Sequence, residues 1–104
     1  MTYEELHKLL SDGLGIPFAV HHWDKPPAMP YGVYFDDRTN NFGADSRVYH
    51  VVRHFLIELY TRQRDPELES RAEALLDGAE LYWDKDATYI DSERFYQISY
   101  EIEV

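Results

Sequence analysis

The chain has 104 residues, with 20 Asp and Glu against 10 Lys and Arg, so its formal net charge at pH 7 is −10 and we expect a single acidic domain over residues 1–104. That charge argues against a protein that binds nucleic acid or an anionic membrane surface, and the absence of cysteine excludes a disulfide framework, a zinc ribbon and a cysteine nucleophile. The acidic N-terminus is not typical of a signal peptide, and no stretch approaches the roughly 20 apolar residues of a membrane-spanning helix, so we expect a soluble intracellular protein.

The chain begins with a predicted helix. Thr2 and Glu5 have the spacing of a capping box, and the leucines that follow recur at helical spacing. Gly13 lacks the Cβ that would clash in the left-handed conformation at a helix end. These signals predict a helix over about residues 2–12.

Three strands are predicted in the middle of the chain. Apolar and polar residues alternate over residues 16–23 and 31–36, and the longest extended run covers residues 48–62. The proline-rich segment 25–30 cannot form a helix or a central strand and predicts a stiff connector.

The segment 36–47, DDRTNNFGADSR, is polar and rich in residues that tolerate turn conformations. It predicts a long hairpin loop between two strands. Because long polar loops carry binding functions, this loop is also the candidate protein interface. The candidate interface residues are Asp36, Asp37, Arg38, Asn40, Asn41, Phe42 and Asp45.

The long strand over residues 48–62 has two different faces. Arg53 interrupts the face that is otherwise apolar, so we expect a bulge or a partly open region near it. The apolar side chains of that face are Tyr49, Val51, Phe55, Ile57 and Leu59.

The last part of the chain predicts a helix and two strand regions. An N-cap aspartate followed by proline begins a helix over residues 65–78. Residues 80–83 and 87–91 predict a strand bent around 84–86. Strict alternation then predicts a final strand over residues 95–104.

The predicted order is therefore α-β-β-β-α-β-β. Alternation of apolar and polar residues indicates a mostly antiparallel sheet with one covered side. Two amphipathic helices packed on one face supply that cover. The fold class is α+β with two layers.

Histidines and carboxylates suggest a metal site that the spacing does not support. His21 and His22 are neighbours in a predicted strand and point to opposite faces. His50, His54 and Glu58 share a strand face, but steps of four residues separate them by about 13 Å, too far for ligands that bind at about 2 Å. A partner on another strand remains an open alternative. Without a phosphate-binding loop or a nucleophile elbow, we predict no catalytic, metal or cofactor-binding residues, and no enzyme.

Aromatic residues make up 15% of the chain, and nine of them are tyrosines. A domain of this size cannot bury all of them. Because tyrosine combines a large apolar ring with a polar tip, it suits protein–protein interfaces. The aromatic strand residues therefore indicate either half-buried sheet positions or a binding surface.

Three stretches carry a resemblance to a known family. They are PYGVYFDDRTNNFGADSRVYH (residues 30–50), FLIELYTRQRDPELESRAEALLD (55–77) and LYWDKDATYIDSERFYQISYEI (81–102). The chain resembles the small head–tail joining and tail-terminator (tail completion) proteins of long-tailed, siphovirus-type phages and prophages of Gram-positive bacteria. The resemblance covers nearly the whole chain and implies the same order of elements.

The resemblance also implies a function without catalysis or cofactor. Such subunits form a ring, a hexamer in the assembled tail, that ends the tail tube and joins it to the head connector. The implied partners are further copies of the chain, which can be monomeric in solution, the major tail tube protein and the head connector protein. The implied location is the head–tail interface of the virion, with assembly in the bacterial cytoplasm. Under this hypothesis DNA passes through the acidic channel without specific binding.

A small acidic binding or inhibitor module, such as a DNA mimic that acts on a host protein, is the alternative. The size and the net charge of −10 fit such a mimic. A mimic concentrates its carboxylates on one face, however, whereas arginines are interspersed along this chain. The alternative stays open on the sequence.

Overall fold

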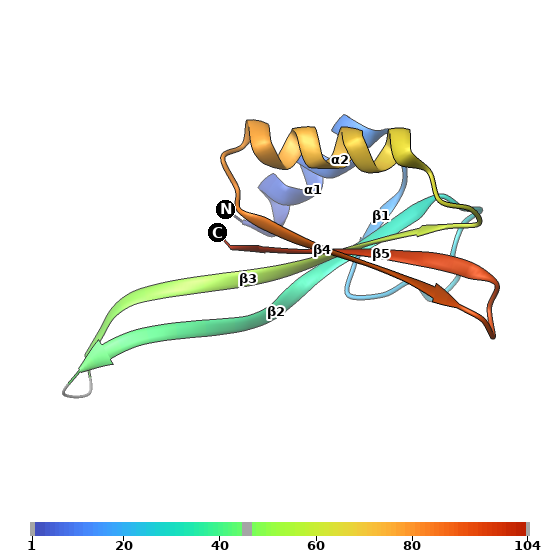
Figure 1. Cartoon of the computed structure of the whole chain (residues 1–104). Helices are drawn as coiled ribbons and strands as arrows, with labels where there is room; N and C mark the ends of the chain where they lie inside the picture. Colours follow the sequence, from blue (N-terminus) through green and yellow to red (C-terminus); the bar gives the residue numbers. More distant parts are fainter. Residues whose placement is uncertain (1, 45–46, 104) are drawn as a thin grey trace.

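In a computed structural model, the described residues form two helices on one face of a five-stranded sheet (Figure 1). The backbone is described over residues 2–44 and 47–103, and the side chains over residues 2–36 and 54–103. The element order is α-β-β-β-α-β-β, which confirms the predicted α+β class. Among these residues no helix is long and apolar enough to cross a membrane.

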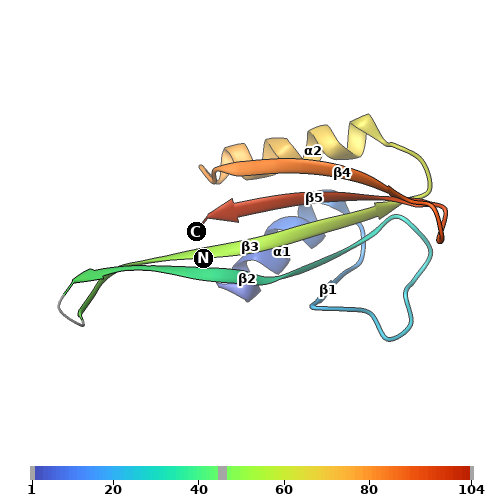
Figure 2. The same cartoon turned by 60° about the horizontal axis from the view of Figure 1, so that its bottom comes forward.

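The strands lie in the order β1-β2-β3-β5-β4. Pairing is antiparallel except between β1 and β2, which run parallel. Figure 2 shows the helices behind this sheet, with one pair of strands leaving the body at one end. The bounds are β1 Phe18–Val20, β2 Tyr31–Ala44, β3 Arg47–Thr61, β4 Trp83–Ile90 and β5 Phe95–Glu103.

The first helix, α1 (Tyr3–Leu14), begins as the sequence predicts and ends two residues later. The Thr2 hydroxyl accepts a hydrogen bond from the Glu5 N–H, and the Glu5 carboxylate accepts one from the Thr2 N–H, so the capping box is confirmed. The left-handed cap is Gly15, at φ 68°, and not Gly13. A Cβ at Gly13 would lie 2.5 Å from a methyl carbon of Leu75, so this glycine permits close packing of the two helices.

The second element is much shorter than the predicted strand over residues 16–23. Only Phe18–Val20 pairs, in parallel with Gly32 to Tyr34 of β2. The His21 N–H still donates to the Tyr34 carbonyl, at 3.0 Å, but His21 itself has φ 70° and turns the chain away from the sheet.

The predicted hairpin loop over residues 36–47 is wrong, because both strands continue through most of it. Pairing runs from Asp36 opposite Phe55 to Ala44 opposite Arg47, with register shifts between 36 and 38 and between 42 and 43. Ladder hydrogen bonds satisfy the backbone whatever the side chains are, so the polar, turn-type residues of this segment do not prevent the strand. The expected irregularity near Arg53 occurs on the neighbouring strand, where Asp37 is the extra residue.

The second helix, α2 (Pro66–Gly78), is confirmed, with Asp65 as its N-cap. The predicted bend around residues 84–86 is wrong, since β4 is continuous and pairs with β5 along its whole length. The alternation of β5 is confirmed, and Ile98, Tyr100 and Ile102 have no exposed surface.

The core lies between the helices and the covered face of the sheet. Leucines of α1 and α2 pack there against odd-numbered side chains of β3 and even-numbered side chains of β5. The most completely buried side chains are Leu6, Leu10, Leu59, Leu76, Ile98, Tyr100 and Ile102. Burial of this apolar surface is the main source of the stability of the body.

Candidate interaction surfaces

The first candidate surface is a two-stranded ribbon, which we define as residues 37–44 and 47–53. Pairing between β5 and β3 ends at His54, opposite Glu103, and pairing between β1 and β2 ends at Tyr34. Beyond these points β2 and β3 pair only with each other among the described residues, and the ribbon extends away from the body (Figures 1 and 2). The molecule measures 49 × 30 × 23 Å along its principal axes.

A ribbon of this kind has no third strand among the described residues to satisfy its outer edges. Two isolated strands are marginally stable in water, and free edges are templates for pairing with another chain. The ribbon is therefore a candidate surface for pairing or packing with another chain.

The sequence-predicted interface residues nearly all fall in or beside this ribbon. Asp36 precedes it, and its N–H donates to the Tyr3 hydroxyl at 2.7 Å, which ties the base of the ribbon to α1. The backbone places the others along β2, and Asp45 lies outside the described residues. The paired positions are Arg38 with His54, Asn40 with Val52, Asn41 with Val51 and Phe42 with His50, and Asp37 is the bulged residue.

The second candidate surface is a groove on the sheet face that the helices leave open. A row of aromatic rings crosses it from the segment after β1 to β5, with ring centroids 6.2, 5.2 and 5.4 Å apart. The carboxylates of Glu58 and Glu93 also line the groove. We call this surface the aromatic groove; its rings are those of Trp23, Tyr31, Tyr60 and Phe95.

Local geometry explains how the groove is built. The Trp23 indole N–H donates to the Gly32 carbonyl at 3.0 Å, which fixes the ring against the edge of β2. Tyr31 is only 8% exposed although it lies on the open face. Burial, with the charge of Glu93 as a smaller cause, raises the pKa of the Tyr31 phenol. The segment after β1 thus converts part of an open sheet face into a lined groove.

Glu58 lies at the floor of the groove and is held by neutral donors. The Tyr60 hydroxyl donates to it at 2.9 Å, and the Gln97 side-chain amide donates to its other oxygen. Burial, and after it the hydrogen bond to Glu58, raises the pKa of the Tyr60 phenol, so the hydroxyl keeps its proton at neutral pH and donates to Glu58. Among the described side chains, no Lys, Arg or His lies within ion-pair distance of Glu58.

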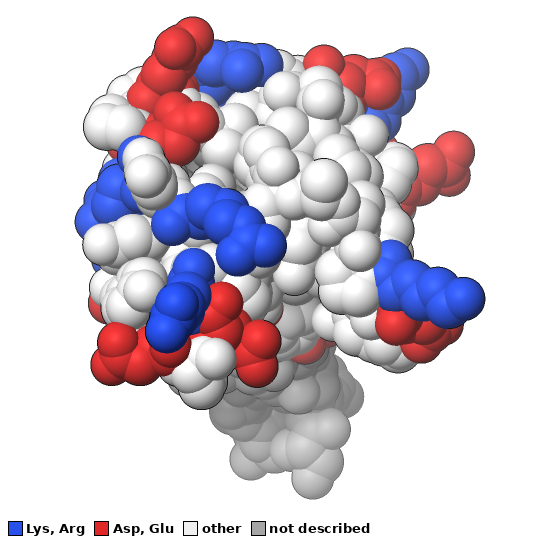
Figure 3. Space-filling model, turned by 90° about the vertical axis from the view of Figure 1, so that its right-hand side faces the viewer, with Lys and Arg blue, Asp and Glu red and all other residues white. Residues whose placement is uncertain are grey.

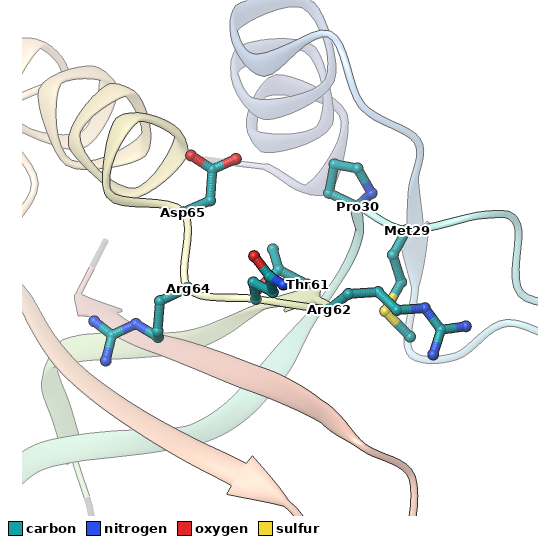
Figure 4. Close-up of a pocket in the computed structure, with 7 residues that line it drawn as sticks. Met29, Pro30, Thr61, Arg62, Arg64 and Asp65 are labelled. Carbon is teal, nitrogen blue, oxygen red and sulfur yellow. The ribbon is translucent and has the colours of Figure 1, made fainter.

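A cleft at the end opposite the ribbon is the third surface. It lies between the cis Met29–Pro30 peptide and the segment that joins β3 to α2, and Arg62 and Arg64 line it (Figure 4). Figure 3 shows Lys and Arg side chains gathered on this end of the body, with Asp and Glu side chains beside them. The Thr61 hydroxyl is buried there, and no group of the described residues forms a hydrogen bond with it.

The polar groups around α2 serve the fold. The Glu69 side chain is only 6% exposed, and it receives two hydrogen bonds from the Arg64 guanidinium, each at 2.9 Å, and the Lys85 ammonium at 2.6 Å. The Arg64 hydrogen bonds are the largest cause that lowers the pKa of Glu69. Glu73 accepts hydrogen bonds from Lys85 and from the Tyr100 hydroxyl, each at 2.7 Å. This network ties α2 to β4 and β5.

The histidines do not form a common site in the described structure. His21 and His22 belong to the turn after β1, and the side chain of His50 lies outside the described residues. His54 is 4% exposed and lies 3.2 Å from Glu101. Among the described side chains, no group of three potential metal ligands comes together.

Sequence reasoning missed the aromatic groove. The alternation that marks Glu58 and Tyr60 as one face of β3 was a visible signal. No such signal marks Trp23, because its position in the groove depends on the short β1 and on the turn at His21.

Comparison with known proteins gives a clear structural likeness. No protein-family model matches the chain, and no curated protein matches it. A chain in the solved structure titled "Virion of native gene transfer agent (GTA) particle" is similar in fold, with a TM-score of 0.67 at 16% sequence identity. The alignment covers 97% of this chain and 87% of that chain. Nearly the whole fold is therefore shared with a component of a virion structure.

Proposed function

We propose that this chain is a structural subunit of a phage or prophage virion, located at the head–tail interface. In this proposal it forms a ring, a hexamer in the assembled tail, that ends the tail tube and joins it to the head connector. It has no catalytic role and needs no cofactor. Its partners are further copies of itself, the tail tube protein and the connector protein.

The observation that carries the proposal is the likeness over 97% of the chain to a component of a virion structure. It agrees with the resemblance of the sequence to head–tail joining and tail-terminator proteins. The ribbon adds physical support, because each subunit of a closed ring must offer two different surfaces to its neighbours. A body with a projecting ribbon at one end and a lined groove toward the other meets that requirement.

The net charge of −10 is compatible with a ring through which DNA passes. An acidic channel wall repels phosphate and does not retain it. In this proposal DNA is cargo, and the subunits make no specific contact with it.

Inactivation of the gene in a host that produces the particles tests the proposal. We expect electron microscopy to show DNA-filled heads and separate tails, with joined particles restored by the wild-type gene in trans. Overlong tail tubes would identify a terminator, and tails of normal length a joining adapter. Joined particles in normal number would contradict the proposal, and binding of the purified chain to a nucleic-acid enzyme would then favour the inhibitor alternative.

A further inference from the structure

The aromatic groove has the chemistry of a cation site. Glu58 is half-buried at its floor, and Glu93 lies at its rim on the turn between β4 and β5. Among the described side chains neither carboxylate has a cationic partner within ion-pair distance. Two carboxylates on one surface attract a cationic group of another chain and favour a partner of complementary charge.

The rings around these carboxylates favour one kind of cation. A guanidinium group stacks on aromatic faces and donates hydrogen bonds to a carboxylate in a fixed planar fork. An ammonium group is more strongly hydrated and lacks that fork. The rings of Trp23, Tyr31, Tyr60 and Phe95 therefore suit an arginine side chain of a partner.

The hairpin that forms the ribbon carries charge complementary to these carboxylates. Over residues 37–53 the sequence contains three arginines, Arg38, Arg47 and Arg53, against two acidic residues, Asp37 and Asp45. The chain as a whole has twice as many acidic as basic residues. The ribbon leaves the body away from the end where the segment after β1 and the turn between β4 and β5 lie, so a copy cannot fill its own groove (Figures 1 and 2).

We propose that the ribbon of one copy docks in the aromatic groove of the next, with Arg38 or Arg53 against Glu58 and Glu93. This inference rests on the proposed ring and names the contact that closes it. The contact joins two different surfaces, so it propagates head to tail and ends only when the ring closes. It also covers a ribbon beside which the described part of the chain places no further strand.

Site-specific cross-linking tests the contact directly, because the chain has no cysteine of its own. Asn41→Cys places a thiol on the ribbon and Ser92→Cys places one beside the groove, on the exposed turn before Glu93. With a bis-maleimide, the doubly substituted chain should give a ladder of oligomers on a denaturing gel. Each singly substituted chain can give only dimers, and it is the matched control.

Charge exchange tests the chemistry of the contact. In the doubly substituted chain, Arg38→Glu with Arg53→Glu should lower the cross-linked fraction about tenfold. Adding Glu93→Arg, on the exposed turn, should restore most of it. Asp12→Arg makes the same charge change on α1, away from the groove, and should restore nothing. Circular dichroism and thermal unfolding of each variant verify that the body is folded.

The outcomes separate this inference from the proposed function. If light scattering shows oligomers but the doubly substituted chain gives no cross-linked products beyond those of the single-cysteine chains, the proposed contact is overturned. The proposed ring is then not contradicted. Neither oligomers nor ladder, even in concentrated protein, would also overturn the contact, while the gene-inactivation phenotype decides the proposed function independently. A ladder that Arg38→Glu with Arg53→Glu leaves unchanged would show that the surfaces meet without the arginine contact, and would overturn that part.

Discussion

The body and the ribbon of this molecule are stabilised in different ways. In the body, two helices bury leucines against the sheet, and side chains such as Leu10, Leu76 and Ile98 have no exposed surface. In the ribbon, two strands continue past the last residue pair that β5 reaches, and among the described residues their backbones pair only with each other. The body therefore has a core of its own, whereas the ribbon has none. Under the proposed function, this difference predicts that assembly depends on the ribbon and folding on the body.

The largest effect on stability should come from a cavity in the body. Leu76 lies on α2 with no exposed surface, so Leu76→Ala should lower the free energy of unfolding by about 2–5 kcal/mol. Urea denaturation followed by circular dichroism measures the loss. Lys8→Ala, at an exposed position of α1, is the control and should change little. A loss below about 1 kcal/mol for Leu76→Ala would mean that the helix layer contributes less than its burial implies.

A smaller effect is expected where α2 is tied to the edge of the sheet. Glu69→Gln keeps the size of the side chain but removes the charge that Arg64 and Lys85 contact, so it should cost about 1–3 kcal/mol at neutral pH. Because the pKa of Glu69 is lowered below 4.5 in the folded chain, its contribution is present above pH 4.5 and disappears as the pH falls through the lowered value.

Denaturation series above and below pH 4.5 check this expectation. The difference in unfolding free energy between wild type and Glu69→Gln should shrink on the acidic side. A difference that stays constant with pH would assign the effect of the substitution to packing and not to charge.

Loss of the capping box should lower the free energy of unfolding less than the change at Glu69. Thr2→Ala removes the hydroxyl that accepts from the Glu5 N–H, and it should cost about 1 kcal/mol. Thr2→Ser retains an acceptor at the same place and should restore most of the loss, as the midpoint of thermal unfolding will record. Equal losses for both substitutions would argue against the cap as the cause.

Shortening the ribbon should affect the stability of the body least and assembly most. Replacing residues 40–52 with Asn-Gly closes β2 and β3 by a two-residue hairpin turn just past the paired Thr39 and Arg53. We expect the unfolding free energy to change by less than about 1 kcal/mol, while oligomers disappear from light scattering. A body that unfolds on this change would contradict the division between the two regions. Unchanged oligomers would assign assembly to the body.

Elements whose signals are local could be predicted from the residues alone. The capping box at Thr2, the Asp65–Pro66 start of α2 and the alternation along β5 all predict the observed elements. Each depends on residues a few positions apart, through one cap or one side-chain period, so no knowledge of distant partners is needed. The segment 36–47 was predicted to be a loop and a candidate interface; the loop is wrong, and the interface stays a prediction.

The remaining features depend on partners far apart in the sequence, so they follow from the folded chain and not from local patterns. Strand pairing across the hairpin turned the polar segment after Asp36 into a ribbon. Packing of α2 on β4 buried Glu69 between Arg64 and Lys85, although its carboxylate indicates a solvent-exposed helix position. The aromatic groove likewise exists because β2, β3 and β5 align rings from distant segments across one face, and such alignment is set by register and not by local residue type.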